Sequence, residues 1–155
     1  MQLSKDLREF VELLNSRKIK YLLVGGHAVA LHGHPRYTGD VEFLIDTSPE
    51  NAARVAAAVD DFGFAGLGLK EGDFRAPEII IQLGRPPNRI DILTSIAAVS
   101  FEEAWRTRVE TLLDGLPVSV ISKELLVQNK LAAARPQDLA DAAKLREMDE
   151  QNPAA

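Results

Sequence analysis

Two acidic residues, Asp40 and Glu42, lie two positions apart at the start of an otherwise apolar segment, residues 40–46 (Asp-Val-Glu-Phe-Leu-Ile-Asp). In a β-strand, residues two apart point to the same face, so the two carboxylates would lie side by side. The apolar residues around them indicate a covered, central strand, whereas a solvent-facing strand end is the alternative. Because neighbouring carboxylates repel, this placement favours a counter-charge such as a hard divalent cation.

A second apolar segment, residues 18–24, predicts a buried strand that ends at Gly25-Gly26. A short helix is predicted directly afterwards, over residues 27–32. Paired glycines let a backbone approach a ligand closely, and a helix N-terminus offers free N–H groups to an anion. A tight strand-to-helix turn without a ligand explains the same pattern, so both interpretations stay open.

A third carboxylate, Asp91, lies between Ile90 and Ile92 in a strand predicted over residues 89–94. A charged group among apolar neighbours needs a partner. Arg89 is two positions away on the same face and can supply one as an ion pair. This ion pair is a structural alternative to a functional role for Asp91.

The other segments predict one α+β domain over residues 1–150, with a disordered tail over residues 151–155. Apolar residues at helical spacing predict a first helix over residues 3–16. Further helices are predicted over residues 47–62, 101–106, 122–134 and 137–148. Two hairpins are predicted, joining residues 78–83 to 89–94 and residues 109–113 to 116–121. The glycine-rich residues 63–72 predict a flexible stretch.

Composition excludes several classes of protein. The 155 residues contain no cysteine, which rules out a disulfide scaffold and thiolate metal sites. The chain has 18 Lys and Arg against 23 Asp and Glu, so a scaffold built on non-specific nucleic-acid contacts is not favoured. The apolar runs fall short of the ~20 residues that span a bilayer, and the N-terminus does not match a signal peptide. We therefore expect a cytoplasmic protein with no membrane partner.

Taken in chain order, a Gly-Gly pair before a helix, two acids on the next strand and one acid on a later strand resemble the nucleotidyltransferase superfamily, which shares the DNA polymerase beta fold. Residues 21–40 (YLLVGGHAVALHGHPRYTGD) and 130–141 (KLAAARPQDLAD) are similar to motifs of its small prokaryotic members found in toxin–antitoxin pairs. The resemblance covers about residues 19–145. It implies a mixed sheet flanked by helices, with a C-terminal helical pair.

The resemblance also implies an activity, namely transfer of a nucleoside monophosphate from a nucleoside triphosphate to a protein hydroxyl or an RNA end. Asp40, Glu42 and Asp91 would be the catalytic, metal-binding residues, holding two Mg²⁺ or Mn²⁺ ions at the two ends of an in-line displacement. The nucleotide-binding residues would be Gly25, Gly26, His27, Arg36, Thr38 and Lys130. A cognate antitoxin would be a further partner.

One position departs from the family pattern, because the family usually has Asp-x-Asp and Glu42 stands at the second acid. This departure favours an alternative, a catalytically degenerate member that binds nucleotide and acts as a binding or regulatory partner. A purely structural partner, which would bind no nucleotide, is a third class.

Two further clusters of polar residues have structural interpretations. His27, His32 and His34 lie close in sequence, but they lack the i,i+4 spacing that places two ligands on one helix face, so zinc is not favoured. We expect His32 and His34 to pack or to face solvent. An ion-pair network between the last two helices is predicted for Arg135, Asp138 and Asp141.

Overall fold

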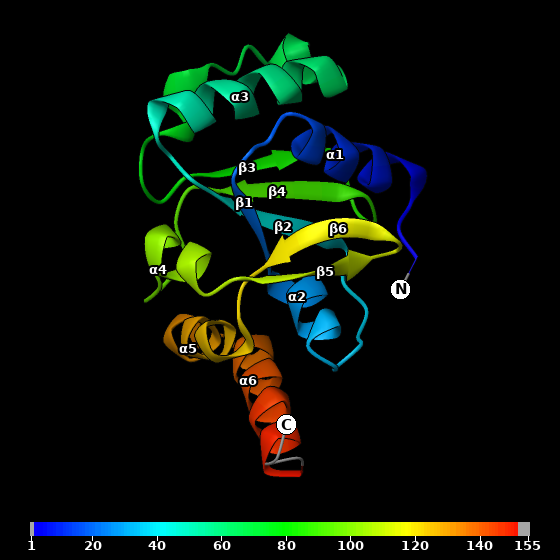
Figure 1. The fold of residues 1–155 in the computed structure, drawn as a ribbon, viewed down its shortest axis with the longest axis vertical. Coiled ribbons are helices and arrows are strands. Elements are labelled where there is room, and N and C mark those ends of the chain that lie inside the picture. The colour runs from blue at the N-terminus through cyan, green and yellow to red at the C-terminus, as the bar shows by residue number, and fades with distance from the viewer. Residues whose placement is uncertain (1, 152–155) are drawn as a thin grey trace.

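The computed structural model describes residues 2–151 of the chain and places a mixed sheet at its centre, as predicted (Figure 1). The strands follow the order β3-β4-β2-β1-β6-β5 across the sheet. Their bounds are β1 (Tyr21–Val24), β2 (Asp40–Ile45), β3 (Ile80–Leu83), β4 (Arg89–Leu93), β5 (Val109–Leu113) and β6 (Leu116–Val120). The central pair β1 and β2 is antiparallel, and each pairs in parallel with its outer neighbour, β6 or β4. The two predicted hairpins form the outer pairs.

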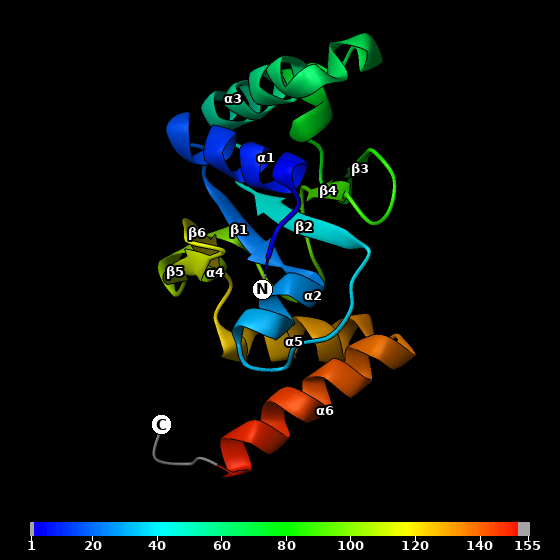
Figure 2. The same cartoon turned by 90° about the vertical axis from the view of Figure 1, so that its right-hand side faces the viewer.

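Helices cover the sheet from two sides (Figures 1 and 2). They are α1 (Lys5–Ser16), α2 (Gly25–Leu31), α3 (Pro49–Val59), α4 (Phe101–Arg106), α5 (Lys123–Ala133) and α6 (Pro136–Gln151). α1 and α3 lie above the sheet in Figure 1, whereas α2 and the predicted C-terminal pair α5 and α6 lie below it. The site described below forms on this lower side.

Short polar signals explain where the helices begin. A serine precedes α1, α3, α4 and α5, and each serine hydroxyl accepts a hydrogen bond from a backbone N–H in the first turn of its helix. Such caps satisfy donors that have no partner inside the helix. Serine caps therefore set the start of each of these helices.

The glycine-rich segment after α3 contains short turns, η1 (Asp60–Phe64), η2 (Ala65–Leu67) and η3 (Glu71–Phe74), where we predicted a flexible stretch. Its end is anchored because the Phe74 side chain is fully buried in the core. The short helical turns and the buried Phe74 thus give this segment a defined conformation in the structure despite its glycines.

The hydrophobic core holds the two central strands in place. All four residues of β1 are buried, because helices cover the sheet on both faces. On β2, Phe43 packs against Phe10 of α1 and Tyr21 of β1, with ring centroids 5.7 and 5.5 Å apart. Burial of such rings contributes about 1.5–3 kcal/mol each. β2 is thus a rigid support for Asp40 and Glu42 at its start.

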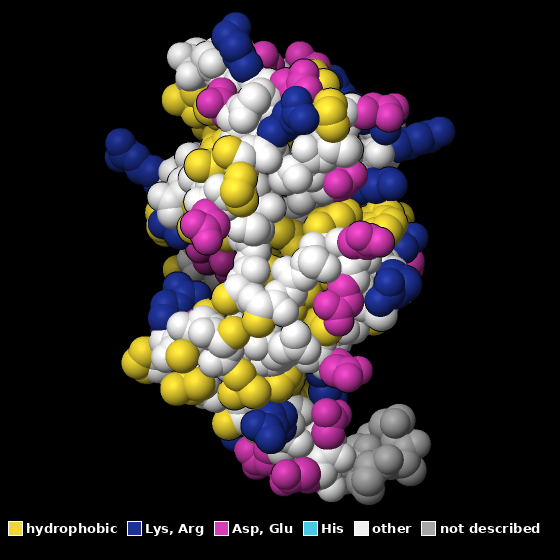
Figure 3. Space-filling model, turned by 90° about the vertical axis from the view of Figure 1, so that its left-hand side faces the viewer, with side chains coloured by type: hydrophobic (Ala, Val, Ile, Leu, Met, Phe, Trp, Pro, Cys, Tyr) yellow, Lys and Arg dark blue, Asp and Glu magenta, His cyan; other side chains and the backbone are white. Residues whose placement is uncertain are grey.

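The surface carries charges of both signs. On the face drawn in Figure 3, acidic and basic side chains are interspersed with hydrophobic groups. Within residues 2–151, the structure contains no helix with the length and apolar character needed to cross a membrane.

Candidate active site

Three carboxylates meet at one end of the central strands. β2 and β4 are parallel, with Asp40 opposite Arg89 and Glu42 opposite Asp91. Asp40, Glu42 and Asp91 each contribute a carboxylate oxygen, and these oxygens lie within 4.8 Å of one another. The structure therefore brings together the three acids that the sequence singled out, and the strand that carries two of them is central, as predicted.

Arg89 is the partner of two of these acids. Its Nε donates to Asp91 Oδ1 at 2.9 Å, and its Nη2 donates to Asp91 Oδ2 at 3.1 Å and to Asp40 Oδ2 at 2.8 Å. The ion-pair interpretation of Asp91 is therefore correct. Sequence reasoning missed the contact with Asp40, because that contact depends on the register between β2 and β4.

The three acids differ in proton affinity. Burial raises the pKa of Glu42, and the nearby negative charge of Asp40 adds to this effect. Burial also raises the pKa of Asp91. For Asp40, burial acts in the same direction, but hydrogen bonds with Asp91, Arg89 and Thr38 outweigh it and lower the pKa. Glu42 is thus the acid whose charge the protein compensates least.

The paired glycines allow other parts of the chain to approach α2 closely. A Cβ atom on Gly25, whose φ is +68°, would lie 1.8 Å from Glu42 Oε2. A Cβ on Gly26 would lie 2.9 Å from the Thr38 Cβ and 3.3 Å from Arg36 Nη1. The glycines are therefore required by contacts within the protein, and the predicted backbone contacts with a triphosphate stay a prediction.

A buried ion cluster forms the opposite wall. Lys130, with a side chain only 6% exposed, places Nζ 3.2 Å from Asp138 Oδ1 and 3.3 Å from Asp141 Oδ2. Arg135 Nε donates to Asp138 Oδ2 at 2.7 Å. Arg36 donates to both oxygens of Asp141, at 2.9 and 2.8 Å. The predicted ion-pair network is present, and it also includes Arg36 and Lys130.

The cations of this cluster favour the ionised form of both of its aspartates. Burial raises the pKa of Asp138 and Asp141, but their hydrogen bonds with Arg135 and Arg36, together with the Lys130 charge, outweigh it and lower both. Three cations therefore surround two carboxylates, which leaves one positive charge in excess beside the cavity.

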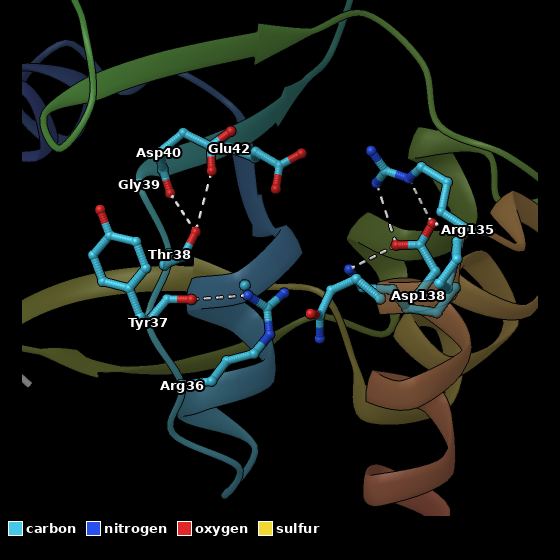
Figure 4. Close-up of a pocket in the computed structure, with 12 residues that line it drawn as sticks. Arg36, Tyr37, Thr38, Gly39, Asp40, Glu42, Arg135 and Asp138 are labelled. Atoms are coloured by element: carbon cyan, nitrogen blue, oxygen red, sulfur yellow. Dashed lines mark hydrogen bonds and ion pairs between the residues drawn. The ribbon is translucent and has the colours of Figure 1, made fainter.

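A cavity of about 410 Å³ separates the two walls. In Figure 4 the segment from Arg36 to Asp40 lies on one side, Arg135 and Asp138 lie on the other, and Glu42 lies between them. The lining residues are Gly26, Arg36, Tyr37, Thr38, Gly39, Asp40, Glu42, Lys130, Arg135, Pro136, Gln137 and Asp138.

The predicted nucleotide-binding residues divide into two groups. Gly26, Arg36, Thr38 and Lys130 line the cavity, whereas Gly25 and His27 do not. His27 is 8% exposed and its Nδ1 has no hydrogen-bond partner within the described chain. Burial lowers the pKa of His27 and favours the neutral ring. The His32 Nε2 lies 2.7 Å from the Ile121 carbonyl oxygen, in agreement with the packing role expected for it.

Sequence reasoning missed Arg135 as a cavity residue and assigned it only to the ion-pair network. The signal was the Arg135-Pro136 pair at the helix break. α5 ends at Ala133, and the next residue, Ala134, has a φ of +59°. Arg135 follows this turn and lines the cavity.

A comparison with protein families now identifies the chain. A family model described as nucleotidyltransferase of unknown function (DUF6036) matches residues 1–148. The chain belongs to this nucleotidyltransferase family. The superfamily predicted from the motifs is thereby confirmed, while the toxin–antitoxin type stays a prediction. No curated protein matches the sequence of this nucleotidyltransferase.

Solved structures share the fold of this nucleotidyltransferase. The lincosamide antibiotic adenylyltransferase LnuA, lincomycin-bound, has a TM-score of 0.58 at 19% identity, covering 93% of this chain and 96% of that one. A putative nucleotidyltransferase (TM1012) from Thermotoga maritima has a TM-score of 0.58 at 17% identity, covering 94% and 91%. ANT(2")-Ia in complex with adenylyl-2"-tobramycin has a TM-score of 0.56 at 15% identity, covering 90% and 84%. The predicted nucleotidyltransferase-like α+β fold is confirmed.

Proposed function

We propose that this nucleotidyltransferase transfers a nucleoside monophosphate from a nucleoside triphosphate with the help of a divalent cation held by Asp40, Glu42 and Asp91. The convergence of these three carboxylates, with oxygens within 4.8 Å of one another, carries the proposal. Carboxylate oxygens are the ligands that Mg²⁺ and Mn²⁺ prefer, so the donor set fits such a cation. When bound, the cation supplies neutralisation of phosphate charge and polarisation of the phosphoryl group.

The charge distribution around the cavity supports a nucleoside triphosphate as the ligand. Asp40 and Glu42 line one part of the cavity, and Arg36, Lys130 and Arg135 together form a cationic wall, to which Arg36 contributes from the segment that leads to Asp40. Phosphate oxygens would face the cationic wall, where guanidinium groups make charge-assisted hydrogen bonds to them. Arg36 and Arg135 are each held in one orientation by a buried aspartate, so little side-chain freedom would be lost on binding.

The acceptor is the least constrained part of the proposal. We retain a protein hydroxyl or an RNA end, as the motif resemblance implies. A small hydroxyl compound is supported by the fold neighbours whose names include lincomycin and adenylyl-2"-tobramycin. The same neighbours support adenylyl transfer, so ATP is the first donor to test. The resemblance to toxin–antitoxin members further supports a cognate antitoxin as a cytoplasmic partner.

A second candidate function is nucleotide binding without turnover. Two observations favour it, namely the glutamate at position 42 and the engagement of Asp40 and Asp91 by Arg89. A protein of this kind would act as a binding or regulatory partner. Single-turnover transfer assays separate the two candidates.

The test uses each α-labelled nucleoside triphosphate with Mg²⁺ or Mn²⁺ and, in separate reactions, host protein extract, RNA or hydroxylated small molecules. We expect label to move to one acceptor class in a reaction that chelation stops. Glu42→Ala should abolish transfer and Glu42→Asp should retain or raise it, while Glu102→Ala, which alters an exposed acid of α4, should leave it unchanged. Transfer that survives Glu42→Ala would remove Glu42 from the cation site. Nucleotide binding without transfer would favour the second candidate.

A further inference from the structure

Arg89 occupies a special place in the acidic cluster. Its guanidinium contacts both Asp40 and Asp91 through hydrogen bonds of 2.8–3.1 Å. It is a single cation placed between two of the three carboxylates proposed to hold the divalent cation. Among residues 2–151, no hydrogen bond or ion pair is made to the Glu42 carboxylate, and the positive charges that lower its pKa are those of Lys130 and Arg135.

The backbone makes this contact hard to avoid. Arg89 lies directly opposite Asp40 in the parallel pair of β2 and β4, and it shares a face of β4 with Asp91 two residues later. Neighbouring strands of a sheet lie only about 4.8 Å apart. Arg89 is only 28% exposed at its side chain, so packing further limits where the guanidinium can go.

We propose that Arg89 is the resident counter-cation of the acidic cluster, which stabilises the cation-free protein and competes with the divalent cation for Asp40 and Asp91. This inference rests on the proposed function, since it concerns the same carboxylates. It adds that cation binding requires Arg89 to release at least one of its two aspartates.

Charge arithmetic supports competition. Three ionised carboxylates carry three negative charges, and Arg89 already offsets one of them. A divalent cation bound to the same oxygens would lie near the guanidinium, and the two positive groups would repel. At about 5 Å this repulsion is worth roughly a tenfold change in binding constant even at the dielectric constant of water. Removal of the guanidinium should therefore tighten cation binding.

The experiment measures cation binding directly, without nucleotide, so that it does not depend on turnover. Mn²⁺ alone is titrated into wild-type protein, Arg89→Gln and Arg89→Lys, and free Mn²⁺ is followed by electron paramagnetic resonance. We expect Arg89→Gln to bind Mn²⁺ at least about tenfold more tightly than wild type. Arg89→Lys keeps the charge but loses the planar two-point contact, so its affinity should lie between the two.

Arg85→Gln is the matched control. It removes the same charge from an exposed position in the loop between β3 and β4, four residues before Arg89. Its Mn²⁺ affinity should stay close to wild type, which separates a local effect from a change in net charge. Thermal unfolding without cation provides a second readout. There Arg89→Gln should lower Tm, because Asp40 and Asp91 then face each other uncompensated, and Mn²⁺ should restore the loss.

A third measurement uses wild-type protein and does not depend on the folding of a variant. The Arg89 Nε–H resonance in ¹⁵N-labelled protein should shift on titration with diamagnetic Mg²⁺, with the same midpoint as Mg²⁺ binding. Mn²⁺ binding that is weaker or unchanged in Arg89→Gln would overturn the proposal and assign Arg89 a purely supporting role. Absence of cation binding by wild type and by every Arg89 variant would overturn both this inference and the proposed role of the cation. Failure of transfer with intact cation binding would overturn the proposed function alone.

Discussion

The contact between Gly25 and Glu42 allows a quantitative prediction for the substitution Gly25→Ala. Gly25 has a φ of +68°, and a Cβ there would lie 1.8 Å from Glu42 Oε2 and 2.6 Å from its Cδ. The left-handed backbone conformation costs a non-glycine residue about 1–2 kcal/mol. Crowding of a packed site costs about 1–3 kcal/mol more. We expect a total loss of about 2–5 kcal/mol in the free energy of unfolding, or a fall in Tm of roughly 4–20 °C for a domain of this size.

Two other glycines separate these contributions. Gly68 has a φ of +65° and Gly66 does not have a positive φ, and neither has a heavy atom within 4 Å of its Cβ position. Gly68→Ala should therefore show only the backbone cost, and Gly66→Ala should be close to neutral. The difference between Gly25→Ala and Gly68→Ala then measures the contact with Glu42.

The assay is urea unfolding of the single variants and of the Gly25→Ala, Glu42→Ala double variant. Because Glu42→Ala removes the crowded carboxylate, the double variant should recover the part of the loss that exceeds the backbone cost. The interaction free energy should be about 1–3 kcal/mol. A Gly25→Ala loss no larger than that of Gly68→Ala, or no recovery in the double variant, would refute this reasoning. Activity should also be lost in Gly25→Ala, because Glu42 must move away from Asp40 and Asp91.

Four other predictions concern the ion cluster and the acids. Lys130→Met should lower the free energy of unfolding in urea by about 3 kcal/mol. This value is at the lower end of the range for a broken buried ion pair, because Asp138 and Asp141 each keep an arginine partner. Folding lowers the pKa values of Asp138 and Asp141, so the stability that these residues contribute is present above their usual pKa near 4 and is lost as the pH falls through their folded pKa values. Acid unfolding should therefore show a loss of stability confined to the range below about pH 4. Since burial raises the pKa of Glu42, its ionised form opposes folding at neutral pH, so Glu42→Gln should raise the Tm of the cation-free protein at pH 7, with a difference that vanishes below the unfolded pKa. Calorimetry should detect nucleoside triphosphate binding with Mg²⁺ and lose it with chelator, because Asp40 and Glu42 otherwise repel the phosphates; equal binding in both conditions would contradict the cation's role.

Hydrophobic patterns predicted most of the fold because each strand or helix is specified by local spacing. The apolar residues of the 40–46 segment correctly placed β2 in the centre of the sheet. The helix predicted over residues 47–62 begins as α3 at Pro49, since the Ser48 cap and Pro49 both act within a single turn. Local signals of this kind do not depend on the rest of the molecule.

The contacts of the site could not be predicted in the same way. Arg36 and Asp141 are separated by 105 positions, and nothing local indicates that they pair. The contact between Arg89 and Asp40 depends on strand register, which no residue pattern in either strand specifies by itself. The sequence therefore identified the acids, but the cations that surround them required the three-dimensional arrangement.

The buried ion cluster has a consequence for how sequences of this kind can change. Arg36 and Asp141 form one bidentate pair, and Lys130 joins that pair to Asp138. Loss of Asp141 leaves Arg36 without its carboxylate partner, and loss of Arg36 leaves Asp141 paired with Lys130 alone. An isolated substitution at either position is therefore penalised, although a matched pair of substitutions need not be. The residue at position 36, in the loop before β2, and the residues of α5 and α6 that form this cluster with it must consequently change together. A chimera that takes the final two helices from a relative should fold only if it takes that relative's residue at position 36 as well.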